Sequence, residues 1–233
     1  MRLPFATYGR DDLALTTLAW IVTIQFPLNR RGTGDWLDWC WWTVAVVVTL
    51  VWLFLLNFFR DPERVTPQGE FLIISPADGT VQDFAEVDEP GFLGETASRI
   101  GIFLSPLNVH VNRMPMDCTV VQRLYVKGKM LKAYDPLAIT ENEACSACIE
   151  VLGGRAKLIV RQVTGAVARR IVCPVEPGQR YAAGQRYGMI KLGSRTEVWA
   201  PKSTAVTRHV KIGDKVRGGE TVLGVLNPTK GRA

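Results

Sequence analysis

The sequence predicts a mainly β (α+β) fold, in which a barrel-sandwich-like β domain follows an N-terminal hydrophobic helical hairpin. Two apolar stretches within the first 59 residues predict the hairpin. From residue 60 onwards, short runs rich in Val, Ile and Thr alternate with Gly, Pro and Asp turns, a pattern typical of strands. We therefore expect two domains, a membrane-associated hairpin over 1–59 and a β-rich domain over 60–233.

The hairpin prediction depends on residues 13–28 and 39–59. The second stretch, WCWWTVAVVVTLVWLFLLNFF, contains no charged residue, and about 20 apolar residues are needed to cross a bilayer as a helix. The first stretch is shorter and is interrupted by Gln25 and Pro27. An interfacial aromatic belt is indicated by Trp36, Trp39, Trp41 and Trp42. A hairpin buried in a protein core is the alternative, but its position before a polar region favours a membrane.

The β domain is predicted from the spacing of its apolar runs. These runs lie within residues 71–87, 100–115, 118–128, 148–153, 156–163, 188–201 and 207–226. Residues 75–81 and 212–222 resemble the two halves of lipoyl-type barrel-sandwich domains, which is an argument about fold alone. No long stretch of helical period follows residue 60, so we expect few helices there.

Composition limits the compartment and the partners. The chain has 233 residues, a net charge of +6 and a pI of about 9.2. A basic balance fits nucleic acid or an anionic membrane surface, and the absence of a Lys/Arg run or nucleic-acid motif favours the membrane. Five cysteines, an odd number, indicate a reducing compartment. Cys145 and Cys148 have the spacing of half a zinc site, but no second pair exists, so we expect no metal.

The Gly193–Ser194 pair is either a turn or a bond that the protein breaks in itself. If the Ser194 hydroxyl attacks the Gly193 carbonyl, the amide becomes an ester, and elimination followed by hydrolysis leaves a pyruvoyl group on the new chain. Glycine suits the acyl side because it has no side chain to block attack. The pair alone does not separate these two interpretations.

A self-cleaving serine needs a base, and the sequence offers few. His110 lies in a strand-like run, and Asp78 lies in a Pro-Ala-Asp-Gly turn. An Asp that holds a His serving a Ser is a recurrent arrangement. The alternatives are a structural strand histidine and an ordinary turn aspartate.

Six blocks together carry a resemblance to a known family. The blocks are FFRDPER at 58–64, SPADG at 75–79, FLSPLNVHVNR at 103–113, ENE at 141–143, GAVARRI at 165–171 and YGMIKLGSR at 187–195. In this order they resemble the phosphatidylserine decarboxylase proenzymes of the short bacterial and archaeal type. Longer members carry a second histidine three positions after the one that matches His110, and this chain has Arg113 there.

The resemblance implies a pyruvoyl-dependent carboxy-lyase that converts phosphatidylserine to phosphatidylethanolamine through a Schiff base. Cleavage at 193/194 would give a long chain, 1–193, and a short chain, 194–233, which carries the pyruvoyl group derived from Ser194. His110 would return a proton to the substrate. Arg169 and Arg170 would recognise phosphate or carboxylate, although a solvated charge pair is the alternative. The role of Arg113 stays open.

The resemblance also implies partners and a location. We expect a phospholipid substrate, a cell-membrane location with the catalytic domain facing the cytoplasm, and no nucleic-acid partner. Strands at 188–191 and 196–199 are expected to pair in one sheet and so hold the two chains together; homo-oligomerisation stays open. Two other functions compete: a decarboxylase of a related lipid such as archaetidylserine, and a non-catalytic membrane-anchored β adaptor.

Overall fold

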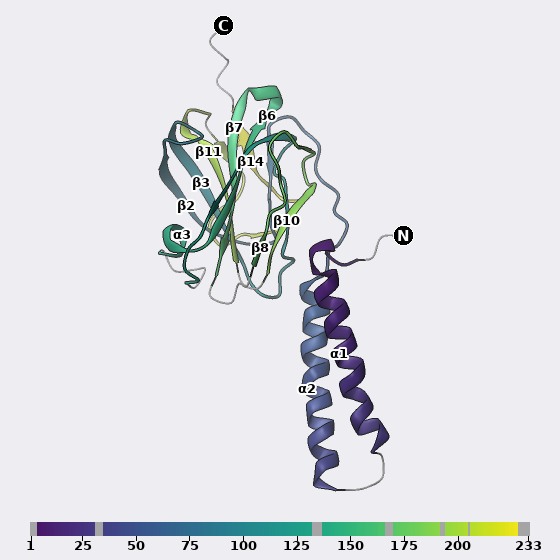
Figure 1. Cartoon of the computed structure of the whole chain (residues 1–233). Helices are drawn as coiled ribbons and strands as arrows, with labels where there is room; N and C mark the ends of the chain where they lie inside the picture. Colours follow the sequence, from purple (N-terminus) through teal and green to yellow (C-terminus); the bar gives the residue numbers. More distant parts are fainter. Residues whose placement is uncertain are drawn as a thin grey trace. The chain divides into compact units, whose positions relative to one another are not determined.

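The structure is a computed structural model that describes residues 4–30, 35–131, 137–165, 170–191, 194–204 and 206–227. The chain divides into two compact units, Met1–Pro62 and Glu63–Ala233. The first unit is a pair of helices, and the second consists mainly of strands (Figure 1). The prediction of a mainly β, α+β fold is therefore confirmed.

The first unit contains a short 3-10 turn, η1 (Thr7–Gly9), and two long helices, α1 (Arg10–Asn29) and α2 (Trp36–Phe58). Helix α1 continues through Pro27. Trp20 of α1 stacks on Trp52 of α2, with ring centroids 4.4 Å apart. Each indole donates to a threonine of the other helix, Trp20 to Thr49 at 2.9 Å and Trp52 to Thr17 at 3.0 Å. These reciprocal bonds satisfy the indole N–H groups inside the hairpin.

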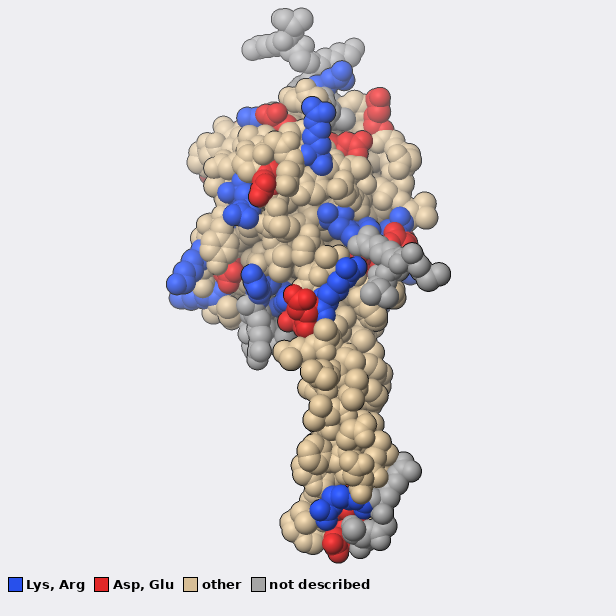
Figure 2. Space-filling model, turned by 45° about the vertical axis from the view of Figure 1, so that its right-hand side comes forward, with Lys and Arg blue, Asp and Glu red and all other residues tan. Residues whose placement is uncertain are grey.

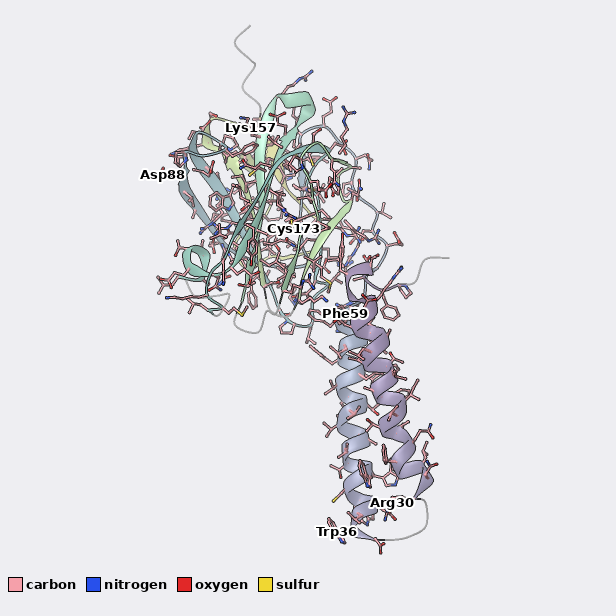
Figure 3. The ribbon with its side chains drawn as sticks, viewed as in Figure 1. Arg30, Trp36, Phe59, Asp88, Lys157 and Cys173 are labelled. Carbon is pink, nitrogen blue, oxygen red and sulfur yellow. The ribbon has the colours of Figure 1, made fainter. Side chains whose placement is uncertain are left out.

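The outer surface of the hairpin is apolar. Helix α2 is long and apolar enough to cross a membrane. Only 6% of its most apolar 18-residue stretch is buried. Figure 2 shows few charges along the two helices, with blue basic and red acidic side chains gathered at one end. Arg30 and Trp36 lie at that loop end, and Phe59 lies at the other (Figure 3). Such exposure does not fit the buried core hairpin that the sequence left as an alternative.

The second unit contains one large sheet with the strand order β13-β2-β3-β11-β7-β6-β5-β9. Its central strands lie side by side in Figure 1. The bounds are β2 Gly79–Glu89, β3 Glu95–Leu104, β5 Cys118–Val126, β6 Ala144–Val151, β7 Ala156–Thr164, β9 Arg180–Tyr181, β11 Ser194–Pro201 and β13 Lys215–Val216. Every neighbouring pair is antiparallel.

Two three-stranded sheets complete the β unit. One has the order β1-β14-β12, with β1 Leu72–Ile74, β14 Val222–Leu226 and β12 Val206–Arg208. The other has the order β4-β10-β8, with β4 Val111–Arg113, β10 Arg186–Lys191 and β8 Arg170–Val172. The short helical elements are α3 Ala138–Glu141, η2 Leu152–Gly154 and η3 Lys202–Thr204.

A large apolar cluster draws residues from all three sheets. Ile102, Leu158 and Val198 from the large sheet are buried in it, as are Tyr187 of β10 and Leu223 of β14. Alternate residues of a strand point to one face, so each central strand supplies this cluster from every second position. Burial of such side chains is the main favourable term in folding.

One strand pairing differs from the prediction. Residues 188–191 belong to β10 and residues 196–199 to β11, and these strands lie in different sheets. β10 pairs with β4 and β8, whereas β11 pairs with β3 and β7. The expected pairing is wrong because both edges of β10 and both edges of β11 are occupied by other strands.

Candidate active site

Ser194 is the first residue of β11, where the chain enters the large sheet. It sits between Leu104 of β3 and Thr164 of β7, and its side chain is completely buried. Within the part of the chain that the structure describes, its Oγ has no hydrogen-bond partner. A buried polar group left unsatisfied costs about 1–3 kcal/mol. Such a group is therefore rare in a native structure and indicates a functional role. Gly193, the predicted acyl side, lies outside the described residues.

His110 is held by a tight turn that follows β3. The Asn108 side chain accepts from both the amide and the hydroxyl of Ser105, at 2.9 and 2.8 Å. The Nδ1 atom of the completely buried His110 lies 2.9 Å from the carbonyl oxygen of Asn108. Because a carbonyl oxygen only accepts, Nδ1 carries the proton of the neutral ring and Nε2 is the basic nitrogen. The turn thus fixes the tautomer that a general base needs.

The His110 segment runs directly beside the strand that leads to residue 193. The amide of Ile190 donates to the carbonyl oxygen of His110 at 3.3 Å, and Met189 of β10 is the pairing partner of Val111 of β4. Ile190 precedes Ser194 by four residues. The His110 segment therefore lies against the strand that precedes Ser194 in the chain.

A buried amide network joins the same strand to β11. Asn112 of β4 donates to the Thr196 hydroxyl at 3.1 Å and accepts from the Gln162 amide at 2.7 Å. All three side chains are completely buried. Gln162 lies on β7 opposite Thr196, so one amide group connects three strands. Asn112 lies two residues after His110 and bonds Thr196, which lies two residues after Ser194, so it braces both positions.

Asp78 lies in the turn that precedes β2, and its carboxylate has two defined partners. It accepts from Arg64 at 2.9 Å and from the amide of Gly218 at 2.7 Å. Arg64 also pairs with Glu220 at 2.9 Å. The hydrogen bonds described for Asp78 thus run to Arg64 and Gly218, and the expected Asp78–His110 pair stays a prediction. The turn itself lies against β4, because the amide of Arg113 donates to Pro76 at 2.9 Å.

The predicted arginines occupy different environments. Arg113 is buried and donates to the carbonyl oxygen of Gly184 at 3.0 Å. Arg170 is exposed on β8 and lines a cavity of about 360 Å³ that Arg123 also lines. Arg169 lies outside the described residues.

A cluster of charges occupies the opposite face of β11. Arg195, only 1% exposed, binds Asp83 through both terminal nitrogens, at 2.6 and 2.8 Å, and Glu197 through Nε at 2.7 Å. A side chain on Gly101 of β3 would overlap the Arg195 guanidinium and would have to displace it from its ion pairs. Burial would raise the pKa of Asp83, but Arg195 and Arg99 hold it below its usual range. This cluster anchors the strand that begins with Ser194.

Cys145 and Cys148 do not form a site together. Three residues apart on β6, they point to opposite faces of the sheet. Cys145 belongs to the main apolar cluster, whereas Cys148 packs with Ala97, Ile159 and Trp199 on the other face. A two-ligand metal arrangement is therefore excluded for this pair.

Sequence reasoning missed the residues that brace the site. Asn112, Gln162 and Thr196 are ordinary polar residues in strand-like runs, and only the pairing of β4, β7 and β11 brings them together. The alternation of Arg195 and Glu197 with Thr196 offered a signal, because charges on one face of a predicted buried strand require partners.

Comparisons with known proteins complete these observations. The sequence model of the family described as phosphatidylserine decarboxylase matches residues 51–224. A phosphatidylserine decarboxylase proenzyme of Geobacter metallireducens is 46% identical over 183 residues, which cover 78% of this chain and 82% of that protein. Proenzymes of the same name from Chlorobium chlorochromatii and Nitratidesulfovibrio vulgaris are 42% and 38% identical, cover 94% and 98% of this chain, and are matched over 98% and 99% of their own length.

Proposed function

The chain belongs to the phosphatidylserine decarboxylase family, and we propose that it cleaves itself between Gly193 and Ser194 and then decarboxylates phosphatidylserine to phosphatidylethanolamine. The observation that carries this proposal is the buried Ser194 Oγ, which has no hydrogen-bond partner in the described part of the chain. The printed name "proenzyme" of the relatives supports processing of a precursor.

The cleavage chemistry needs one nucleophile and one base. The Ser194 Oγ adds to the Gly193 carbonyl carbon, its proton passes to the base, and the C–N bond breaks to leave an ester with a free amine. Loss of the Ser194 α-proton then expels the Gly193 carboxylate, and water releases ammonia from the product. His110 is the proposed base, because its Nδ1 contact with Asn108 leaves Nε2 as the basic atom.

Asp78 has a proposed role as the charge that stabilises the protonated base. Its defined contacts support a second role, since it joins Arg64 near the start of the β unit to Gly218 beyond the cut. A single carboxylate would thereby hold the turn that packs on β4 and tie the long chain to the short one.

The pyruvoyl group derived from Ser194 would supply the electron-accepting carbonyl that loss of carbon dioxide from an amino acid requires. The site fits it, because position 194 is completely buried and its hydroxyl has no competing partner in the described residues. The pairs with Leu104 and Thr164 and the Asn112–Thr196 bond hold this position. His110 would supply the proton that replaces the lost carboxylate.

Pairing within the large sheet would keep the two chains together after cleavage. β11 lies between β3 and β7, and both of those strands belong to residues 1–193. β14 pairs with β1, and the Arg64–Glu220 ion pair adds a further link. The strands of the short chain would therefore stay paired with strands of the long chain, and no disulfide would be needed to hold the two together.

The substrate and the membrane make further demands on the surface. Arg169 and Arg170 stay the proposed phosphate or carboxylate ligands, and the Arg123 side chain at the Arg170 cavity adds positive charge. Helix α2, with its exposed apolar side chains, is the proposed anchor in the cell membrane, with the β unit on the cytoplasmic side.

The experiment that tests the proposal compares the purified protein with Ser194→Ala. The parent should run as two chains on a denaturing gel and release carbon dioxide from phosphatidylserine. The variant should stay as one chain near 25.9 kDa and release none. A parent that stays intact and yet decarboxylates the lipid would overturn the proposed link between cleavage and activity.

A further inference from the structure

Two cysteines line the cavity that also contains Arg123 and Arg170. The cavity, of about 360 Å³, lies where β5 and β6 approach the segment that follows β8. Cys145 comes from β6 of the large sheet, and Cys173 directly follows β8 of the small one. Both side chains are buried, 3% and 8% exposed. Figure 3 shows Cys173 within the β unit.

The two cysteines line the same cavity and belong to the same apolar cluster, and their side chains are near enough to affect each other's ionisation. The backbone around them is well held. Cys145 pairs with Tyr125 of β5 and with Gln162 of β7, and Arg123 donates to the carbonyl oxygen of Cys173 at 3.2 Å. The two cysteines thus lie at the wall of one cavity, one on β6 of the large sheet and the other directly after β8 of the small sheet.

The environment divides the two thiols into unequal partners. The hydrogen bond from Cys173, helped by the charge of Arg123, lowers the pKa of Cys145, and the same contact raises the pKa of Cys173. Burial raises the pKa of Cys148 to about 11 and that of Cys118 to about 12. A thiolate is the reactive form of cysteine, and the lowered pKa favours this form at Cys145, which lines the cavity.

We infer that Cys145 and Cys173 are a redox modification site that a peroxide converts to a disulfide within the long chain. The Cys145 thiolate attacks one peroxide oxygen, the O–O bond breaks, and a sulfenic acid and hydroxide form; the hydroxide takes up the proton that the thiol released and becomes water. The Cys173 sulfur then attacks the Cys145 sulfur, the S–O bond breaks, and a second water leaves with the Cys173 proton. A dithiol reductant reverses the change.

Formation of the disulfide does not require the proposed self-cleavage. Both cysteines precede residue 193, so the disulfide can form in the intact precursor and in the cleaved protein alike. The bond would tie β6 to the end of β8, and β8 pairs through Arg170 with Lys191 of β10. It would therefore restrain the strand that leads to the predicted cut.

The test is peptide mapping of the full-length protein after exposure to hydrogen peroxide and alkylation under denaturing conditions. Trypsin leaves Cys145 and Cys148 in residues 133–155 and Cys173 in residues 171–180. We expect these peptides to appear as one cross-linked species, lighter by two hydrogen atoms than their sum, and fragment ions to locate the bond at Cys145. Dithiothreitol should separate them.

Matched variants make the outcome decisive. Cys148→Ser should still give the cross-link, because that thiol is on the other face of β6, whereas Cys145→Ser and Cys173→Ser should lose it. The inference is overturned if the parent oxidises both cysteines to separate sulfinic acids, or if the cross-link persists in Cys145→Ser. Fragment mapping of the peroxide-treated parent, which carries no substitution, decides the matter even if a variant fails to fold.

Discussion

The side-chain amide of Asn112 donates to the hydroxyl of Thr196 at 3.1 Å and thereby joins the strand that follows His110 to the strand that begins at Ser194. Neither residue has proton-transfer chemistry of its own. Their bond sets the spacing between β4 and β11, and it lies in a buried region where a misplaced polar group is costly. The proposed nucleophile and base are thus positioned by residues outside the catalytic set.

Replacement of Thr196 by Val tests this brace. The change keeps the shape of the side chain but removes the acceptor, so the Asn112 amide loses its partner at 3.1 Å. We expect the free energy of unfolding to fall by about 1–3 kcal/mol and self-cleavage to slow, as measured by urea denaturation and by a time course on gels. Thr119→Val, on β5 away from the site, is the control. Unchanged cleavage in Thr196→Val would show that the bond does not position the site.

His110→Ala should slow both cleavage and decarboxylation by about 10²–10⁴-fold, the usual effect of losing a general base or acid. Arg113→His in the same background restores the second histidine of longer family members and should recover part of the cleavage. Because Arg113 also bonds Gly184 at 3.0 Å, Arg113→His alone serves as the control for structural damage. Cleavage of His110→Ala at the parent's rate would remove His110 from the mechanism.

The free energy of unfolding should depend on pH through Asp83. Its folded-state pKa lies below the ordinary value of 3.8, so the ion pair stabilises the protein above that value and is lost as pH falls through the folded pKa. Asp83→Asn should be less stable at pH 7 and should lose less stability between pH about 5 and about 2. Asp88→Asn, on the same strand, is the control. Parallel acid curves for the parent and Asp83→Asn would contradict this expectation.

A shortened chain that begins at Glu63 should cleave itself but bind vesicles poorly. The β unit forms a compact unit of its own from this residue onwards, whereas helix α2 carries the exposed apolar surface. Flotation with vesicles that contain phosphatidylserine measures binding, and a gel measures cleavage. Equal flotation of the full and shortened chains would place the membrane-binding surface on the β unit.

The sequence predicted what repeats locally and missed what depends on pairing between distant strands. The long apolar runs of α1 and α2 and the short Val-rich runs of the strands are visible in the local sequence, so the fold class was accessible. The motifs pointed to Ser194 and His110 as single residues. The separation of β10 and β11 into different sheets was not accessible, because no local pattern tells a crossover from a hairpin. The Asn112–Gln162–Thr196 network and the Cys145–Cys173 pair depend on the same long-range pairing.

The most direct measurement of the central claim is the intact mass of the purified protein together with the chemistry of its short chain. Self-cleavage predicts two masses, for residues 1–193 and 194–233, with a short chain that resists N-terminal sequencing and reacts with a carbonyl reagent such as hydroxylamine. Ser194→Ala should give one mass for all 233 residues. A short chain with a free serine amine would identify ordinary proteolysis and contradict the account.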